Sequence, residues 1–505
     1  LFGVFFFPTL FPCHFAMAPA KRSVALLMEG SRGDMQPYIV AAVALKEAGY
    51  DVLALGPTDC GDMAKQHGLT FRHCGVSARA VTESPELVKA ITDNDYDKLT
   101  AAVSAAKEPH RRHIWETVVN ELKSFKPGLI ISSGMNLGDC ISVGKGMDIP
   151  VMLVTLAVLV PSNYIPPLGL LPQLPSFGNM NWTAWKLIFG FLIKRSQKKS
   201  LPDLADILGQ PQEDLAVSFN EMCQYCSCQP RFPTLFAVSL ALHGPFPQDF
   251  NEMCRPVGPL TFKPQEQVGV DFGSSEAQRL EKFLEECKLS DEAPVYMGFG
   301  SMICHNSKFM TLLCLRALMS CGRRGILLQG WAKLSMEAIE GEADSVELEK
   351  FCRDKVIFVD GAAHGQLFPR CSVIVHHGGA GTTYASAMSG VPCVIVPIFL
   401  DQYLHSNLVN KKGVGVGLKS MQSCRVEELS SAIKQCLDSK EIRQNAAALG
   451  HELSKENGAQ EVVAQVNQFF TEFVDTGRYF KEKKQLKEES KRGFFSRLAS
   501  RLCSR

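Results

Sequence analysis

The chain has 505 residues, of which 46% are hydrophobic and 21% are charged, and its formal net charge at pH 7 is +1. This length predicts two or more domains with large cores, and the composition is typical of a water-soluble globular protein. A nearly neutral chain gives no reason to expect a nucleic-acid partner, and none is predicted.

The cysteines indicate a reducing compartment. All 18 are scattered along the chain instead of being concentrated in one small domain, so a cytoplasmic location is predicted. Cys223, Cys226 and Cys228 form the one close cluster. They could hold a metal ion, but no second paired motif lies nearby, so free thiols are the favoured interpretation.

Residues 1–21 are interpreted as a leader outside the folded core. The run LFGVFFFPTLFPCHFA lacks an initiator Met, and Met17 stands just ahead of the first predicted strand. Pro8 and Pro12 interrupt this run, which is short for a membrane helix, and no basic residue precedes it as in a signal peptide. An incomplete or wrongly extended gene prediction is favoured, with a targeting segment as the alternative.

Residues 22–245 are predicted to form a Rossmann-like domain with a parallel sheet. The domain opens with a buried strand at 23–28, a tight turn at 29–34 and a helix that ends at Gly49. The dinucleotide fingerprint G-x-G-x-x-G is absent. Asp34 follows the first strand, where its carboxylate could face a cleft, cap the helix or pair with Arg32.

The sequence DNDYD at residues 93–97 contains D-x-D twice, which is a pattern of metal-dependent transferases. As a calcium loop it fails, because Lys98 replaces the turn glycine and Ser104 replaces the last carboxylate. A solvated surface loop is predicted instead. Two further strands, at 128–132 and 151–155, flank a predicted helix near 138–146 and continue the sheet.

Residues 156–199 contain a proline-rich loop and then an apolar, aromatic segment at 182–193. The segment ends in the basic residues Lys194, Arg195, Lys198 and Lys199. Such a segment suits a lipid-facing surface or a pocket for an apolar ligand. A core helix of the first domain explains the pattern equally well.

A linker is predicted at 246–265, where proline and glycine are frequent and periodicity is weak. A second Rossmann-like domain is predicted over 266–477. Its first strand runs into Gly298-Phe299-Gly300-Ser301, where backbone and a hydroxyl group can approach a ligand closely.

The strongest motif of the chain lies within residues 371–417. A buried strand ends at His376-His377 and is followed by Gly378-Gly379-Ala380-Gly381 and a helix that begins near Thr382. A glycine turn between a strand and a helix N-terminus binds anions, because unpaired N–H groups and the helix dipole both favour negative charge. This turn is therefore predicted to hold a phosphate.

Asp401 and Gln402 follow the next predicted strand, at 391–397. At the carboxyl end of a neighbouring parallel strand, their side chains are placed to bind the group attached to the phosphates. The spacing suits a nucleotide sugar, with the diphosphate on the helix and the sugar hydroxyls on Asp401 and Gln402.

HHGGAGTT, followed by GVP, P-x-x-x-DQ and GVG, resembles the donor-site signature of the UDP-glycosyltransferases of the GT-B fold, closest to the sterol 3β-glucosyltransferase branch. GSRGD-x-QP at 30–37 and GFGSM at 298–302 resemble the same branch. The resemblance implies two Rossmann-like α/β domains with a nucleotide-sugar cleft between them. It also implies inverting transfer of a hexose, with glucose favoured, from a UDP-sugar to a hydroxyl of a sterol-like lipid acceptor.

The resemblance also implies roles for individual residues. Asp34 would be the general base, and His376 would stabilise the diphosphate, although His376 could instead only pack the strand end. The implied donor-binding residues are Ser31, Arg32, Gly33, Gly300, Ser301, His364, His376, Gly378, Gly379, Ala380, Gly381, Thr382, Asp401 and Gln402. Because these donors can replace a metal, no metal or other cofactor is expected. Gly365, Gln366, Tyr403 and His405 depart from the branch, which leaves the uracil contacts and the sugar open.

Apolar residues recur at helical spacing over 461–474, where the resemblance implies a last helix that crosses back onto the first domain. The tail at 478–505 has ten basic and three acidic residues. Within it, Phe494, Phe495, Leu498 and Leu502 can share one helical face. A peripheral membrane-surface helix and a disordered tail are both consistent with this pattern.

Two other functions fit the same sequence. One is a GT-B enzyme that acts on a soluble aglycone. The other is a non-catalytic protein that binds a nucleotide sugar or a membrane and has kept the fold.

Overall fold

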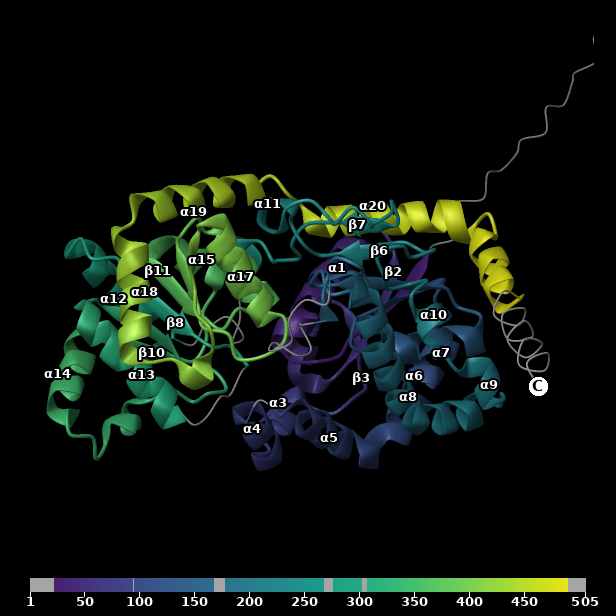
Figure 1. Cartoon of the computed structure of the whole chain (residues 1–505), viewed down its shortest axis with the longest axis horizontal. Coiled ribbons are helices and arrows are strands. Elements are labelled where there is room, and N and C mark those ends of the chain that lie inside the picture. Colours follow the sequence, from purple (N-terminus) through teal and green to yellow (C-terminus); the bar gives the residue numbers. More distant parts are fainter. Residues whose placement is uncertain (1–21, 94, 168–177, 268–275, 302–306, 489–505) are drawn as a thin grey trace, which may run out of the picture.

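The computed structural model describes residues 22–93, 95–167, 178–267, 276–301 and 307–488, and it contains two parallel sheets. Figure 1 shows the sheets side by side, each between layers of helices. The predicted leader and residues 489–505 of the predicted tail lie outside the described residues.

The first sheet has seven strands in the order β3-β2-β1-β4-β5-β6-β7. Every neighbouring pair is parallel. Its strands are β1 Ser23–Leu27, β2 Asp51–Gly56, β3 Thr70–His73, β4 Leu129–Ser132, β5 Val151–Thr155, β6 Thr234–Phe236 and β7 Cys254–Pro256. The central strands are continuous apolar runs because helices cover both of their faces.

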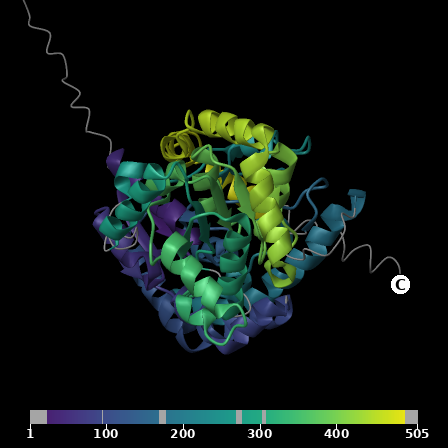
Figure 2. The ribbon, with the colours of Figure 1, turned by 90° about the vertical axis from the view of Figure 1, so that its left-hand side faces the viewer.

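The second sheet has six parallel strands in the order β10-β9-β8-β11-β12-β13. Its strands are β8 Val295–Gly298, β9 Gly325–Leu328, β10 Val356–Val359, β11 Val373–His376, β12 Cys393–Ile395 and β13 Gly415–Gly417. Figure 2, viewed from the side of this domain, shows helices on both faces of the sheet. The predicted fold class, two Rossmann-like α/β domains, is confirmed.

The helices of the first domain cover both faces of its sheet. They are α1 Arg32–Glu47, α2 Gly61–Gln66, α3 Ala78–Thr82, α4 Pro85–Thr92, α5 Tyr96–Lys107, α6 Arg111–Phe125, α7 Leu137–Met147, α8 Asn181–Leu208, α9 Gln212–Leu215, α10 Phe219–Met222 and α11 Leu240–His243.

The helices that follow in the chain belong to the second domain, except the last, which crosses back. They are α12 Ala277–Leu289, α13 Ser307–Cys321, α14 Ser345–Lys355, α15 His364–Leu367, α16 Ala380–Met388, α17 Gln402–Lys412, α18 Val426–Asp438, α19 Lys440–Leu453 and α20 Gly458–Phe469.

Two local expectations need correction. The predicted surface loop at 93–97 gives way to α5 at Tyr96, because the Asp95 carboxylate accepts the backbone N–H of Lys98 at 3.0 Å and caps the helix. The strand predicted at 391–397 is paired only over Cys393–Ile395. Pro392 and Pro397 flank the paired part and have no N–H to donate to the sheet.

The cysteines of the described part of the chain are free thiols, and most are buried. Cys223, Cys226 and Cys228 are among them. Burial raises the pKa of the Cys226 thiol to about 12, which keeps it protonated. Residues 22–93, 95–167, 178–267, 276–301 and 307–488 contain no group of three or more His, Cys, Asp or Glu side chains placed to hold a metal ion.

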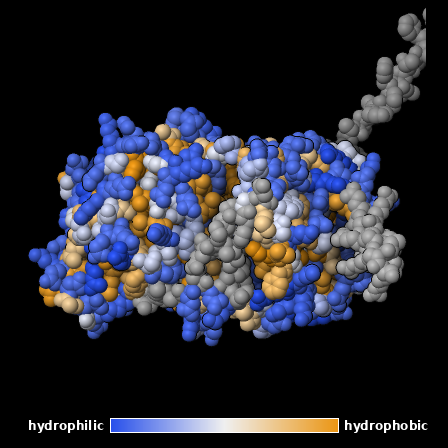
Figure 3. All heavy atoms as spheres, viewed as in Figure 1, coloured by the Kyte–Doolittle hydropathy of each residue, from blue (hydrophilic) through white to orange (hydrophobic). Residues whose placement is uncertain are grey.

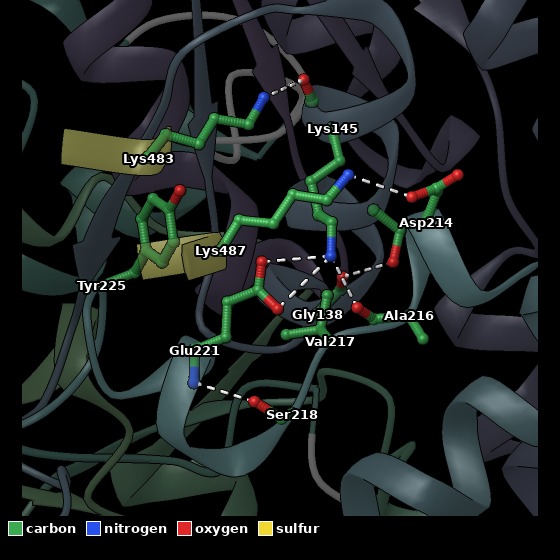
Figure 4. Close-up of polar contacts among 12 residues, drawn as sticks. Gly138, Lys145, Asp214, Ala216, Val217, Ser218, Glu221, Tyr225, Lys483 and Lys487 are labelled. Atoms are coloured by element: carbon green, nitrogen blue, oxygen red, sulfur yellow. Dashed lines mark hydrogen bonds and ion pairs between the residues drawn. The ribbon is translucent and has the colours of Figure 1, made fainter. Parts of the chain in front are cut away.

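The end of the described chain lies on the first domain. Helix α20 packs against α1, and residues 478–488 form a further helix. The Tyr479 hydroxyl is 2.9 Å from that of Tyr225. Figure 4 shows Lys487 reaching Asp214, at 3.0 Å. This first part of the basic tail is therefore a docked helix and not a disordered segment.

No helix in the described ranges is both long enough and apolar enough to cross a membrane.

Candidate functional site

The strand orders place the predicted site residues at the boundary between the two domains, which we call the seam. In each sheet the order reverses beside the first strand, between β1 and β4 and between β8 and β11. Loops that leave neighbouring strands at such a point diverge, and ligands bind between them. Helix α1, which follows β1, and helix α16, which follows β11, also pack against each other across the seam. The turn that contains Asp34 is thereby brought to the predicted phosphate turn.

The glycine turn after β11 has the geometry of an anion site. Gly378 has a φ of +94°, and a Cβ on it would lie 2.7 Å from Ile395 Cγ2, so a side chain does not fit. Gly379 is the N-cap of α16. The N–H groups of Ala380, Gly381 and Thr382 lie in the first turn, where an α-helix has no carbonyl partners for them. These groups and the helix dipole are available to a diphosphate.

His376 supplies a buried donor at the base of this turn. Its side chain is fully buried, and Nδ1 accepts the backbone N–H of Gly378 at 3.1 Å. Since Nδ1 accepts, the neutral ring carries its proton on Nε2, which is buried and has no hydrogen-bond partner among the residues that the structure describes. Burial, with the neighbouring His377, His405 and His364, holds the pKa of His376 well below its usual range. His376 is therefore a neutral N–H donor in the site without ligand.

His377 and His405 fix the geometry of the turn. A Cβ on Gly300 would lie 3.0 Å from His377 Cε1, so this ring sits against the loop after β8. A Cβ on Gly379 would lie 2.5 Å from His377 Nε2, so the same ring sits against the turn. His405 is fully buried on α17, and its Nδ1 lies 2.7 Å from the Gly378 carbonyl, to which it donates. His405, where the sequence departs from the branch, thus holds the phosphate turn through the Gly378 carbonyl. This role was not predicted from the sequence.

Gln402 holds the loop in front of α17. Its Oε1 accepts the backbone N–H groups of Ile398, at 2.8 Å, and Phe399, at 3.0 Å, and the side chain is buried. Leu400 within this loop has a φ of +50°, a strained conformation for a residue with a side chain. The side-chain oxygen Oε1 of Gln402 is therefore bound to the loop, and only the side-chain nitrogen Nε2 remains for a sugar hydroxyl.

Asp401 lies at the start of α17 but does not cap it with its side chain. Burial raises the pKa of the Asp401 carboxyl to about 6, and a hydrogen bond from its own backbone N–H opposes the shift. Within the described residues this carboxylate neither caps the helix nor forms an ion pair, so it is suited to accept hydrogen bonds from sugar hydroxyls.

Asp34 both caps α1 and faces the seam. Its Oδ2 accepts the backbone N–H of Ser31 at 2.8 Å and the Ser31 hydroxyl at 2.9 Å. Among the described residues no hydrogen bond is formed by Oδ1, which leaves this oxygen for another proton donor. Burial raises the pKa of Asp34 to about 6, the two Ser31 hydrogen bonds oppose this shift, and the charge of Asp401 adds to it. Asp34 therefore caps α1 with Oδ2 only, and Oδ1 remains for a second hydrogen bond.

A hydrogen-bond chain joins the two domains at Asp34. The Ser301 hydroxyl, in the loop after β8, donates to the Ser31 hydroxyl at 2.9 Å, and Ser31 in turn donates to Asp34. Two residues predicted to bind the donor thus also orient the predicted base. Gly33 is exposed in the first turn of α1.

His364 lies at the other end of the seam. Its Nε2 is 3.1 Å from the Tyr296 hydroxyl, and its ring stacks on Phe368 with the centroids 4.4 Å apart. Burial, followed by the Arg32 and His377 charges, lowers the pKa of His364 to about 3. Arg32, from the first domain, is therefore close to His364 in the second domain.

The departure at Gly365 has a structural explanation. Gln267 Oε1 accepts the Gly365 N–H at 2.9 Å, and a Cβ on Gly365 would lie 2.9 Å from Gln267 Nε2. Gln366 Nε2 donates to the Pro264 carbonyl at 2.8 Å. The loop predicted to contact the base is thus fastened to Pro264 and Gln267, and a side chain at 365 would displace the Gln267 amide.

Helix α8 resolves the two interpretations of residues 182–193. Trp185 is almost completely buried, and its Nε1 donates to the Ile165 carbonyl at 2.6 Å. Leu187 and Phe191, on the same helix, are exposed. The helix therefore has a core face, as one interpretation required, and an exposed apolar face, as the other required.

Comparison with known proteins agrees with this architecture. Residues 327–469 match the family described as "Erythromycin biosynthesis protein CIII-like, C-terminal domain". A sterol 3-beta-glucosyltransferase of Eremothecium gossypii is 26% identical over 439 residues, which cover 87% of this chain and 33% of that protein. The chain thus spans about a third of the length of that relative.

Solved glycosyltransferases share the fold. CalG4, the calicheamicin glycosyltransferase, matches with a TM-score of 0.60 and 14% identity, covering 90% of this chain and 99% of CalG4. The glycosyltransferase VinC, solved in complex with dTDP, matches with a TM-score of 0.54 and 18% identity, covering 88% of this chain and 98% of VinC. At these identities the likeness establishes the GT-B fold.

Proposed function

We propose that this chain, which is a relative of the sterol 3-beta-glucosyltransferases and has the GT-B fold, is an inverting UDP-glycosyltransferase. It transfers a hexose, with glucose favoured, from a UDP-sugar to the hydroxyl of a sterol-like lipid. The observation that carries the proposal is the chain Ser301–Ser31–Asp34, which joins a predicted donor loop of one domain to the predicted base of the other.

The reaction takes place in one step. Asp34 removes the proton of the acceptor hydroxyl, and the oxygen attacks the anomeric carbon from the face opposite the diphosphate. The bond from that carbon to the diphosphate oxygen breaks, and an α-linked donor gives a β-glycoside. UDP leaves with the bonding electron pair, and Asp34 keeps the proton until it is released to solvent.

The leaving diphosphate is stabilised by groups that are already in place. They are the N–H groups at the start of α16 and the buried Nε2–H of His376. Asp401 and the Gln402 amide nitrogen orient the sugar. With these fixed donors the transfer needs no metal or other cofactor in our proposal.

The chemical class of the acceptor and the cellular location are the most specific parts of the proposal. An apolar, hydroxylated acceptor is supported by the aromatic segment of α8 and by the names of the matched relatives. We place the protein in the cytoplasm, peripherally at a membrane surface.

The first test is UDP release from UDP-glucose with a sterol in detergent micelles, beside a reaction without acceptor. Sterol-dependent release is expected. Release that requires a soluble aglycone instead would replace the lipid acceptor. UDP binding without release on any acceptor would support a non-catalytic nucleotide-sugar-binding protein.

A further inference from the structure

The exposed face of α8 is apolar over its first turns. Met180, just before the helix, is 64% exposed, Leu187 is 70% exposed and Phe191 is 61% exposed. Their spacing of seven and four residues puts them on one stripe of the helix. Figure 3 shows hydrophobic surface gathered where Figure 1 shows α8, close to the seam between the domains. Large apolar side chains gathered in this way mark an interaction surface.

The same helix is strongly basic. Lys186, Lys194 and Lys198 are exposed along it, and no acidic residue occurs between Asn181 and Pro202. Lys199 is engaged by Glu108 at 3.2 Å and is left out of this set. Lys194 and Lys198 continue the line of the apolar stripe toward the end of the helix. Such a stripe fits an anionic lipid surface, because the apolar side chains enter the interface while the ammonium groups reach the headgroups.

The helix is held rigidly by its opposite face. The Ser200 hydroxyl donates to Asp139 at 2.7 Å, and Gln197 exchanges two hydrogen bonds with the backbone of Val217. Trp185 is buried and fixed by Ile165. The exposed stripe is therefore fixed on the outer side of the helix.

We propose that the stripe Met180, Leu187 and Phe191, with Lys186, Lys194 and Lys198, docks the protein on an anionic bilayer. Docking brings the seam to the surface in which a sterol-like acceptor is dissolved, so the purpose of docking rests on the proposed function. The docking itself does not rest on the proposed function. It also does not depend on the tail beyond residue 488.

Flotation of the full chain with vesicles tests the docking. Phosphatidylcholine vesicles are compared with vesicles that also contain phosphatidylserine. The wild type is expected to float with the phosphatidylserine vesicles and to be released by high salt. Leu187→Ser with Phe191→Ser should lower the bound fraction at least about tenfold, as expected from the loss of two inserted apolar side chains.

The matched control is Leu289→Ser with Val346→Ser. These residues of the second domain are also exposed, at 87% and 76%, but have no role in the proposal. The control should float like the wild type. A variant with Lys186, Lys194 and Lys198 all changed to Gln should lose its preference for phosphatidylserine.

Three results would overturn the proposal. One is unchanged flotation of the Leu187→Ser, Phe191→Ser variant, which would assign binding to another segment such as the tail. The second is an equal loss in the matched control. The third is a wild-type dimer that this variant dissociates, which would make the stripe a contact between copies.

Activity separates this proposal from the proposed function. The Leu187→Ser, Phe191→Ser variant should keep wild-type turnover of sterol in detergent micelles and lose it only on vesicles. If the wild type turns over no sterol at all, the proposed function fails while the flotation result still decides the docking.

Discussion

On the second-domain side of the seam, the groups that we propose to face the donor are mostly backbone N–H groups and neutral imidazoles. On the first-domain side the proposed base is a side chain carried by α1. Backbone groups at Gly378–Thr382 are fixed by the fold itself, and His377 and His405 brace them from below. The first-domain side depends on individual side chains such as Asp34. The difference implies that substitutions on the first-domain side change chemistry and those on the second-domain side change donor affinity.

The largest effect is expected from Asp34→Asn. Asn keeps an oxygen that accepts from Ser31, so α1 stays capped, but it cannot accept the acceptor proton. Turnover should fall at least about a thousandfold, as for loss of a general base, while UDP affinity changes less than about threefold. Steady-state kinetics and calorimetric titration with UDP measure the two. Loss of both would show that Asp34 is only a structural cap.

Replacing His376 is expected to affect the donor instead. His376→Leu removes the buried Nε2–H donor and should weaken UDP binding by roughly 10- to 100-fold, corresponding to about 1.5–3 kcal/mol for a hydrogen bond to a charged group. His376→Gln, which retains an N–H donor, should lose less. UDP affinity that is unchanged in His376→Leu would mean that the ring only packs the end of β11.

The pH dependence sharpens the comparison between the two sides. The pKa of Asp34 and that of Asp401 are both raised from 3.8 to about 6, so their carboxylates form as the pH rises through 6. Turnover should rise over that window, and UDP binding should vary less. Because the folded chain holds protons that the unfolded chain releases between pH 3.8 and 6, the stability contributed by these carboxyls falls as the pH rises through that range. The window from pH 5 to 7 covers about one pKa unit on either side of 6. A turnover profile that is flat over this window would contradict the role of Asp34 as the base.

Gln402→Leu should cost stability on the donor side. It leaves the N–H groups of Ile398 and Phe399 without their acceptor beside the strained Leu400, at a cost of about 1–3 kcal/mol. The KM for the UDP-sugar should rise with it. Denaturant unfolding and donor kinetics check both, with Gln435→Leu on the exposed side of α18 as the matched control.

The smallest effect on stability is expected on the first-domain surface. Leu187→Ser should change the free energy of unfolding by less than about 0.5 kcal/mol, since the side chain is exposed. Trp185→Ala, two residues earlier on the same helix, should cost about 3–5 kcal/mol because it empties a buried site. Similar losses for the two would contradict the division of α8 into faces.

The sequence predicted what depends on local signals. The strand before His376, the glycine turn and the helix from Ala380 follow from apolar runs and from glycine itself. The contacts that brace the site were not predictable, because their partners are distant in the chain. Ser301 and Ser31 are 270 residues apart, and Gln267 and Gly365 are 98 apart. The two faces of α8 could not be predicted either, because its apolar residues point in several directions. Only the packing of the neighbouring helices determines which of them are buried.

The last described residues have a consequence for how the protein is made. Tyr479 and Phe473 pack against Phe232, and Phe470 packs against Tyr50, all within the first domain. Gly128, next to β4, has no space for a side chain because the Phe470 ring lies there. On the ribosome these aromatic residues emerge only after the whole second domain has been synthesised. The first domain therefore leaves the exit tunnel first but can close its core last, and a nascent chain that stops before residue 470 exposes apolar surface that chaperones and proteases recognise.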